Sequence, residues 1–199
     1  PPPPAPVTTG HQVYKFSPDG TLLLTLGTAG GAREPGYFTQ PNDVLTTPNG
    51  DIYVVEGHAS QQKTSTARVL KFDKTGKLLG TFGTVVDSTT KSEPYSFNQP
   101  HALAMDSRGR IYVGDRGYNR VKIFDQNMKL LDTWYQLSRP SGVFIDKDDN
   151  VYVADSESQS VDRTRTDWKR GIRIGDKNGK FLAFIPDPAE NPPSTSAAE

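Results

Sequence analysis

A pattern that recurs along the chain limits its possible folds more than any other sequence feature. Its first half occurs three times, at residues 40–54, 99–113 and 139–153, and each copy opens with Gln-Pro or Arg-Pro and closes with Tyr-Val. The tyrosines that mark equivalent positions are Tyr53, Tyr112 and Tyr152. A repeat of roughly 40 to 60 residues indicates a chain built from copies of one small structural unit.

Each copy continues into a second hairpin, whose turn lies between alternating apolar runs. These turns are Thr75-Gly76, Asn127-Met128 and Asn178-Gly179. Each unit is therefore predicted to form four antiparallel strands. An α-solenoid is not expected, because no stretch of ten residues has capped helical periodicity. Four-stranded units with Gly and Pro turns predict an all-β fold, a β-propeller of repeated blades.

The repeat also predicts how the chain is divided. Before the first full copy, only a second hairpin is present, and after the last copy only the start of another unit. The predicted segments are a Pro-rich linker or processed N-terminus at 1–10, a half blade at 11–27, full blades at 37–83, 97–136 and 137–188, and the start of a next blade at 195–199. Because exposed sheet edges are normally covered, we expect a ring that is incomplete or is completed by a partner.

Composition excludes several functions. Lys plus Arg and Asp plus Glu both number 23, so no overall field attracts nucleic acid. Cysteine is absent, which excludes disulfides, thiolate metal sites and a cysteine nucleophile. No apolar run reaches the ~18 residues of a membrane span. The Pro-rich start without an initiator Met favours an extracytoplasmic protein, periplasmic or secreted, and a fragment of a longer chain is the alternative.

The residues of the second copy carry a family resemblance. The stretches 97–106, 111–116 and 119–121 resemble an NHL repeat. More narrowly, the segments 11–15, 38–44 and 168–175 are similar to the propeller of peptidyl-α-hydroxyglycine α-amidating lyases and their bacterial relatives. That resemblance implies a six-bladed propeller that converts a peptidyl-α-hydroxyglycine into a peptide amide and glyoxylate. It also implies a central zinc held by histidines from several blades, and a structural calcium.

Three residues are candidates for chemistry. His101 matches a zinc-ligating histidine of the family, and the alternative is a channel histidine bonded to a neighbouring blade. Arg116 matches an arginine that faces the substrate, and the alternative is a salt bridge between blades, to Asp115 or Glu56. His58 stands where the family has a proton-transfer tyrosine. It could act as a general base, or it could simply be an exposed loop residue.

Further candidates lie at equivalent places in the other blades. Asn42 and Ser141 occupy the position of His101, so only one metal histidine of the family is visible. Asp43, Asp155 and Ser156 could bind a ligand or a divalent ion. The alternative for Asp155 is that its carboxylate closes the turn by accepting bonds from its own backbone.

Two functions follow from these residues. The first is a zinc-dependent carbon–nitrogen lyase of the amidating type. The second is a non-catalytic propeller that binds a peptide, a small molecule or a protein assembly on its top face, the end where His101 lies. In both, a protein partner or an oligomer could complete the ring. The basic stretch around Trp168, from Arg163 to Arg173, superficially resembles a nucleic-acid site, but a local partner-binding or blade-capping loop is the preferred interpretation.

Overall fold

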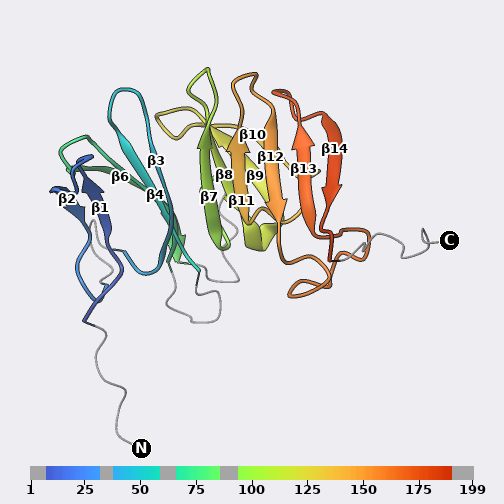
Figure 1. Ribbon diagram of the computed structural model, residues 1–199, viewed down its shortest axis with the longest axis horizontal. Coiled ribbons are helices and arrows are strands. Elements are labelled where there is room, and N and C mark those ends of the chain that lie inside the picture. Colours follow the sequence, from blue (N-terminus) through green and yellow to red (C-terminus); the bar gives the residue numbers. More distant parts are fainter. Residues whose placement is uncertain (1–7, 32–37, 59–65, 86–93, 190–199) are drawn as a thin grey trace, which may run out of the picture.

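The computed structural model describes residues 8–31, 38–58, 66–85 and 94–189. Within them the chain forms three four-stranded antiparallel sheets and one two-stranded sheet, which lie side by side in an arc (Figure 1). The all-β propeller architecture predicted from the repeat is confirmed. Most of the expected linker, the loop at 59–65 and the expected strand start at 195–199 lie outside the described residues.

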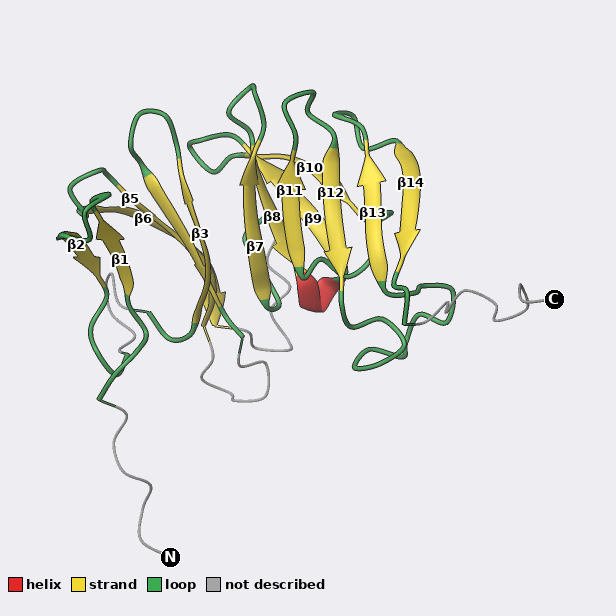
Figure 2. Cartoon of the chain, viewed as in Figure 1, coloured by secondary structure: helices red, strands yellow, loops and turns green. Residues whose placement is uncertain are grey.

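The half blade and the three blades follow one another along the chain (Figure 2). The half blade consists of β1 (Val13–Phe16) and β2 (Leu22–Leu26). The first blade consists of β3 (Pro41–Thr46), β4 (Ile52–Glu56), β5 (Thr66–Phe72) and β6 (Leu78–Val85). The second consists of β7 (Pro100–Met105), β8 (Ile111–Asp115), β9 (Arg120–Phe124) and β10 (Leu130–Trp134), with the 3₁₀ turn η1 (Arg116–Tyr118) after β8. The third consists of β11 (Gly142–Ile145), β12 (Val151–Asp155), β13 (Gly171–Gly175) and β14 (Phe181–Pro186).

An aspartate closes each hairpin between the third and fourth strands. Asp73 Oδ1 accepts bonds from the backbone N–H groups of Thr75 and Lys77, and Asp125 and Asp176 repeat this arrangement in the other two blades. An aspartate that bonds its own backbone two and four residues on offers a ready-made turn. The bond from the Thr75 hydroxyl, with these backbone bonds, lowers the pKa of the Asp73 carboxyl, and the backbone bonds lower the pKa of Asp176. The hairpins predicted from sequence are therefore fixed by local chemistry.

The core lies between neighbouring sheets. The first and second blades bury one apolar cluster that includes Tyr53 and Phe124, and the second and third bury another that includes Tyr112 and Val153. The half blade packs on the first blade through a third cluster, around Phe38. The first strands β3, β7 and β11 are neighbours in space. The arc therefore gathers the ends of these strands on one side of the molecule.

Among the described residues, no sheet packs on one face of the third blade. This open face comprises Phe144, Tyr152, Ile172, Ile174 and Ile185, which cross-strand pairing places on one side of the sheet. Phe144 is 65% exposed and Ile185 51%. In the second blade the residues at matching positions, Tyr112, Val121 and Ile123, are fully buried by the third blade.

A buried ion pair recurs where the second strand meets the third. Glu56 pairs with Arg68 at 2.5 Å, and Asp115 pairs with Arg120 at 2.8 Å. Burial raises the pKa of Asp115 to about 6, although the Arg120 charge acts in the opposite direction. In the third blade Gly171 stands opposite Asp155.

Gly171 cannot readily be replaced by the arginine of the other blades. Its φ is +143°, and a Cβ there would lie 2.2 Å from the carbonyl oxygen of Ile185. The cation near Asp155 comes instead from Arg173, at 3.6 Å. The third blade therefore departs from the repeat at this corner.

Candidate functional site

Two histidines from different blades meet at one end of the arc. His58 lies two residues beyond β4 of the first blade, and His101 is the second residue of β7 in the second blade. Their ring centroids are 5.7 Å apart. His58 is exposed and His101 is half-buried. The first strands β3, β7 and β11 are neighbours. Residues at the starts of these strands therefore come from three different blades and lie near the two histidines.

The hydrogen bond of His101 defines its chemical state. Its Nδ1 lies 2.8 Å from the carbonyl oxygen of Ser141, in the third blade. A carbonyl oxygen can only accept, so Nδ1 carries the proton and the neutral ring keeps its lone pair on Nε2. Metal-binding histidines commonly have one ring nitrogen bonded in this way, which leaves the other as the ligand.

The surroundings of His101 favour the neutral ring. Burial lowers the pKa of the imidazole, and the positive charge of Arg116 lowers it further. The bond to Ser141 and the charge of Glu157 act in the opposite direction, and they are the weaker influences. The net effect is a pKa below the usual value of 6.5. At neutral pH, Nε2 is therefore available to accept a hydrogen bond or to bind a metal ion.

Arg116 is held by an ion pair, and the two partners named from sequence are wrong. Its Nη1 lies 3.2 Å from a carboxylate oxygen of Glu157, in the third blade, because Asp115 and Glu56 are already paired with their own arginines. The side chain is 5% exposed, and its Nε has no hydrogen-bond partner in the described part of the chain. Arg116 therefore joins two blades and places its charge near His101.

The pairing of Glu157 with Arg116 was not predicted from the sequence. Its second carboxylate oxygen accepts a bond from Nε of Arg139 at 2.7 Å, so one carboxylate serves two arginines. Arg139 stands before the proline where the earlier copies have Gln40 and Gln99. A charge that replaces a neutral residue in a repeat needs a new partner nearby, and that substitution was the available signal for Glu157.

The other candidates divide into two groups. Asn42 donates to the carbonyl of Pro100 at 2.8 Å, and Ser156 donates to the hydroxyl of Ser141 at 2.8 Å. Asn42 and Ser141 lie at or next to the starts of the first strands of the first and third blades, as His101 does in the second, and Ser156 follows β12. Their role as ligands stays a prediction.

The carboxylates of Asp43 and Asp155 both accept hydrogen bonds from backbone N–H groups. Asp43 accepts a bond from the N–H of Leu103 at 2.7 Å, which joins the first blade to the second. Asp155 accepts bonds from the N–H and the hydroxyl of Ser158 at 2.9 and 2.6 Å. This geometry is the turn closure that was the alternative for Asp155. Calcium takes six to eight oxygen ligands, and these carboxylates already have protein donors.

The two histidines are of a residue type that binds zinc, but they are fewer than the ligands that a zinc site commonly has. Neutral imidazoles suit zinc, and a catalytic zinc commonly has three protein ligands. Within the described ranges, no group of three or more His, Cys, Asp or Glu side chains could hold a metal ion. His101 and His58 are the two candidates that lie together.

No helix among the described residues is long and apolar enough to cross a membrane.

Comparison with known families identifies the repeat. The model of the NHL repeat matches residues 97–124 and 137–161, which carry the first strands of the second and third blades. These two segments are NHL repeats. The chain is 33% identical, over 121 residues, to human NHL repeat-containing protein 3, and this match covers 59% of the chain and 32% of that protein.

Two amidating lyases are also similar to part of the chain. Peptidyl-alpha-hydroxyglycine alpha-amidating lyase 1 of Drosophila melanogaster is 33% identical over 121 residues, 57% of the chain and 21% of the lyase. A probable lyase of the same name from Caenorhabditis elegans is 29% identical over 123 residues, 59% of the chain and 32% of the lyase. The matched part thus spans about a third or less of these relatives.

Solved structures support the fold. A gluconolactonase from Xanthomonas campestris superposes with a TM-score of 0.60 at 17% identity, over 89% of this chain and 56% of that one. A streptogramin B lyase superposes with a TM-score of 0.58 at 14% identity, over 89% of this chain and 48% of that one. At such identities the likeness extends to the architecture alone.

Proposed function

We propose that the blades form a ligand-binding propeller whose site is the end of the arc around His58 and His101. The observation that carries this proposal is the bond from Nδ1 of His101 to the Ser141 carbonyl. That bond fixes the tautomer and leaves Nε2 as an acceptor at the meeting point of three blades. A small molecule or peptide that donates a hydrogen bond, or that brings a bound metal ion, suits this acceptor.

A metal-assisted amidating lyase is the second candidate, and it rests on the similarity to the two lyases. A zinc ion, when bound, would polarise the substrate hydroxyl group. In this reading His101 is one metal ligand, and exposed His58 accepts a proton in place of the family tyrosine. Arg116, tied to Glu157, orients the site by its charge instead of clamping a carboxylate directly.

One experiment separates the two candidates. N-acetyl-α-hydroxyglycine is titrated into the protein by calorimetry, with and without one equivalent of zinc, and glyoxylate is assayed in the same samples. We expect saturable binding that weakens about tenfold in His101→Gln, the loss typical of one good hydrogen bond or weak metal ligand. Glyoxylate release would support the lyase, whereas binding without release would support the non-catalytic propeller.

The matched control is His11→Gln. His11 lies in the half blade, where its Nδ1 accepts a bond from the N–H of Gln40 at 2.8 Å, outside the proposed site. This variant should bind like the wild type. Absence of binding under both conditions, or equal affinity in His101→Gln, would show that the histidine end is not the ligand site.

A partner sheet on the open face is the second interaction that we propose. Support comes from the repeat itself, because the residues that match this face in the second blade are buried by the next blade. Apolar residues arranged for sheet packing are suited to another blade, supplied by a second copy or by another chain.

A further inference from the structure

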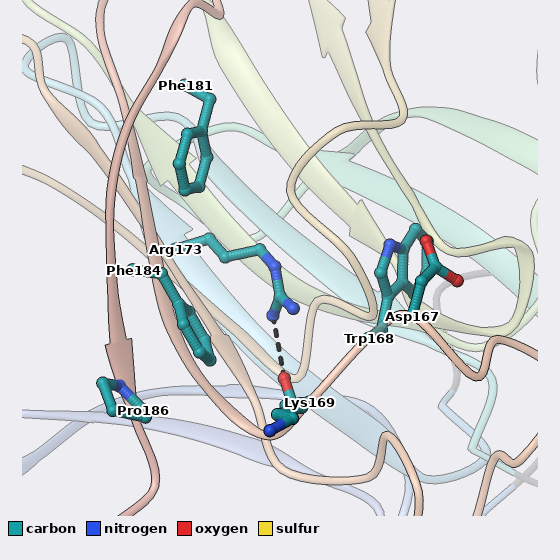
Figure 3. A pocket seen from close by; sticks show the side chains of 7 residues that line it. All are labelled: Asp167, Trp168, Lys169, Arg173, Phe181, Phe184 and Pro186. Carbon is teal, nitrogen blue, oxygen red and sulfur yellow. Dashed lines mark hydrogen bonds between the residues drawn. The ribbon is translucent and has the colours of Figure 1, made fainter.

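We propose a second binding site, in the third blade, for a carboxylate attached to an aromatic or other apolar body. A cavity of about 560 Å³ lies between the loop before β13 and the outer strand β14. Figure 3 shows the guanidinium of Arg173 in its centre, with Phe184 on one side and Trp168 on the other. The remaining lining residues are Asp167, Lys169, Phe181 and Pro186. None of them belongs to the site around His101.

Three of the seven residues that line this cavity are aromatic. Trp168 is 9% exposed, so its position is fixed by packing. The Arg173 guanidinium lies 4.5 Å from the centre of the Phe184 ring, in a cation–π contact that holds both groups in place. Phe181 on the same strand is 47% exposed and leaves apolar surface available to a ligand. Small-molecule sites typically combine apolar and aromatic walls with a small number of placed polar groups.

Arg173 is the polar group that a ligand would meet. Its Nη1 donates to the Ser138 hydroxyl at 2.8 Å and to the Lys169 carbonyl at 3.0 Å, and it is 3.6 Å from Asp155. Within the described part of the chain, Nε and Nη2 have no hydrogen bond, and both reach accessible space. The inner nitrogen thus anchors the guanidinium while an edge with two donors remains free. Such an edge matches the two oxygens of a carboxylate.

The charge of the loop also favours an anion. Residues 163–173 contain five Lys and Arg residues and one carboxylate, Asp167. Both oxygens of Asp167 are engaged by Arg165, at 3.2 Å each. The Lys169 side chain is exposed, and its amine has no partner among the described residues. The rim of the cavity therefore carries a free positive charge beside the buried one.

The second blade shows how the same position is used when there is no site. Lys122 stands in register with Arg173, since Val113 and Val153 are the equivalent partners on the second strands. The Lys122 amine donates to the backbone carbonyls of Pro94 and Ser96 and lies over an aromatic ring. The Lys122 amine is therefore already bonded to groups that precede or belong to its own blade. The open guanidinium edge is therefore particular to the third blade.

The test uses phenylacetate and N-acetylphenylalanine as probes, with phenylacetamide as the uncharged analogue. The chain contains two tryptophans, so its ¹H–¹⁵N spectrum should contain two indole signals. We expect both acids to shift the Trp168 signal in a saturable way and to leave that of Trp134 in place. Loss of the carboxylate charge in the amide should weaken binding about tenfold. If only phenylacetate binds, the ligand is a small acid, whereas tighter binding of N-acetylphenylalanine indicates a peptide carboxyl terminus.

Two variants make the proposal falsifiable. Lys169→Glu reverses an exposed charge at the rim and should weaken binding several-fold without affecting folding. Arg173→Lys keeps the charge but loses the two-donor edge, so it should also weaken binding. Arg163→Glu, in the same loop but outside the lining, is the matched control and should change affinity less than Lys169→Glu. Equal binding of acid and amide, or no effect of Lys169→Glu and Arg173→Lys, would overturn the proposal.

Discussion

Asp115→Ala is expected to lower the free energy of unfolding by about 3–5 kcal/mol, because it leaves the Arg120 guanidinium buried without its carboxylate. Asp115 is fully buried and Arg120 is 7% exposed. The same substitution removes the acceptor for the Asn98 N–H, at 2.6 Å, which begins the loop into β7. Urea unfolding monitored by circular dichroism measures the change.

Lys147→Ala is the matched control. Lys147 and Asp148 also form an ion pair, at 2.8 Å, but their side chains are 86% and 64% exposed. Exposed pairs contribute little to stability, so this variant should unfold at the wild-type urea concentration. If Asp115→Ala were equally harmless, the recurring buried pair would not be holding the second blade together.

Tyr112→Ala is also expected to lower the free energy of unfolding by about 3–5 kcal/mol, since truncating a fully buried aromatic ring leaves a cavity. The Tyr112 ring packs edge-on against Trp134, with centroids 5.5 Å apart, in the core between the second and third blades. Tyr152 holds the same repeat position in the third blade but lies on the open face, against exposed Phe144. Tyr152→Ala should therefore cost only a small fraction of the Tyr112→Ala loss.

Two outcomes of this comparison would contradict the structure. If Tyr152→Ala destabilised the protein as much as Tyr112→Ala, the open face would be covered in solution. A concentration dependence of the unfolding midpoint would then identify a second copy as the cover. Equal and small losses for both variants would contradict the packing of the second blade on the third.

Local chemistry explains why the fold could be predicted from sequence. Tyr53, Tyr112 and Tyr152 lie on the second strands of their blades, because a period of two residues and a closing turn fix the register of each hairpin. The turns depend on aspartates that bond their own backbone within four residues. Such interactions are visible in a sequence since both partners are close together in it.

The site could be predicted only in part, because its contacts join blades. His101 was found from its motif, but its tautomer depends on Ser141, 40 residues away. The partner of Arg116 was assigned wrongly, because no local pattern shows that Asp115 and Glu56 are already paired. The stretch around Trp168 was predicted as a partner-binding or blade-capping loop, but the cavity that it forms with Arg173 was not predicted. That cavity arises where Gly171 breaks the repeat and the loop before β13 has no periodicity.

The state of His101 can be measured directly by long-range ¹H–¹⁵N spectroscopy of the three histidines across a pH titration. In the folded protein, protonation of His101 is opposed by burial and by Arg116. Its contribution to stability is therefore present above pH 6.5 and lost as the pH falls through its lowered pKa. We expect His101 to titrate below 6.5 with the proton of the neutral ring on Nδ1. His11, whose Nδ1 accepts a bond, should show the opposite tautomer. A His101 ring that titrates at or above 6.5, or that carries its neutral-state proton on Nε2, would contradict the proposed acceptor at the centre of the site.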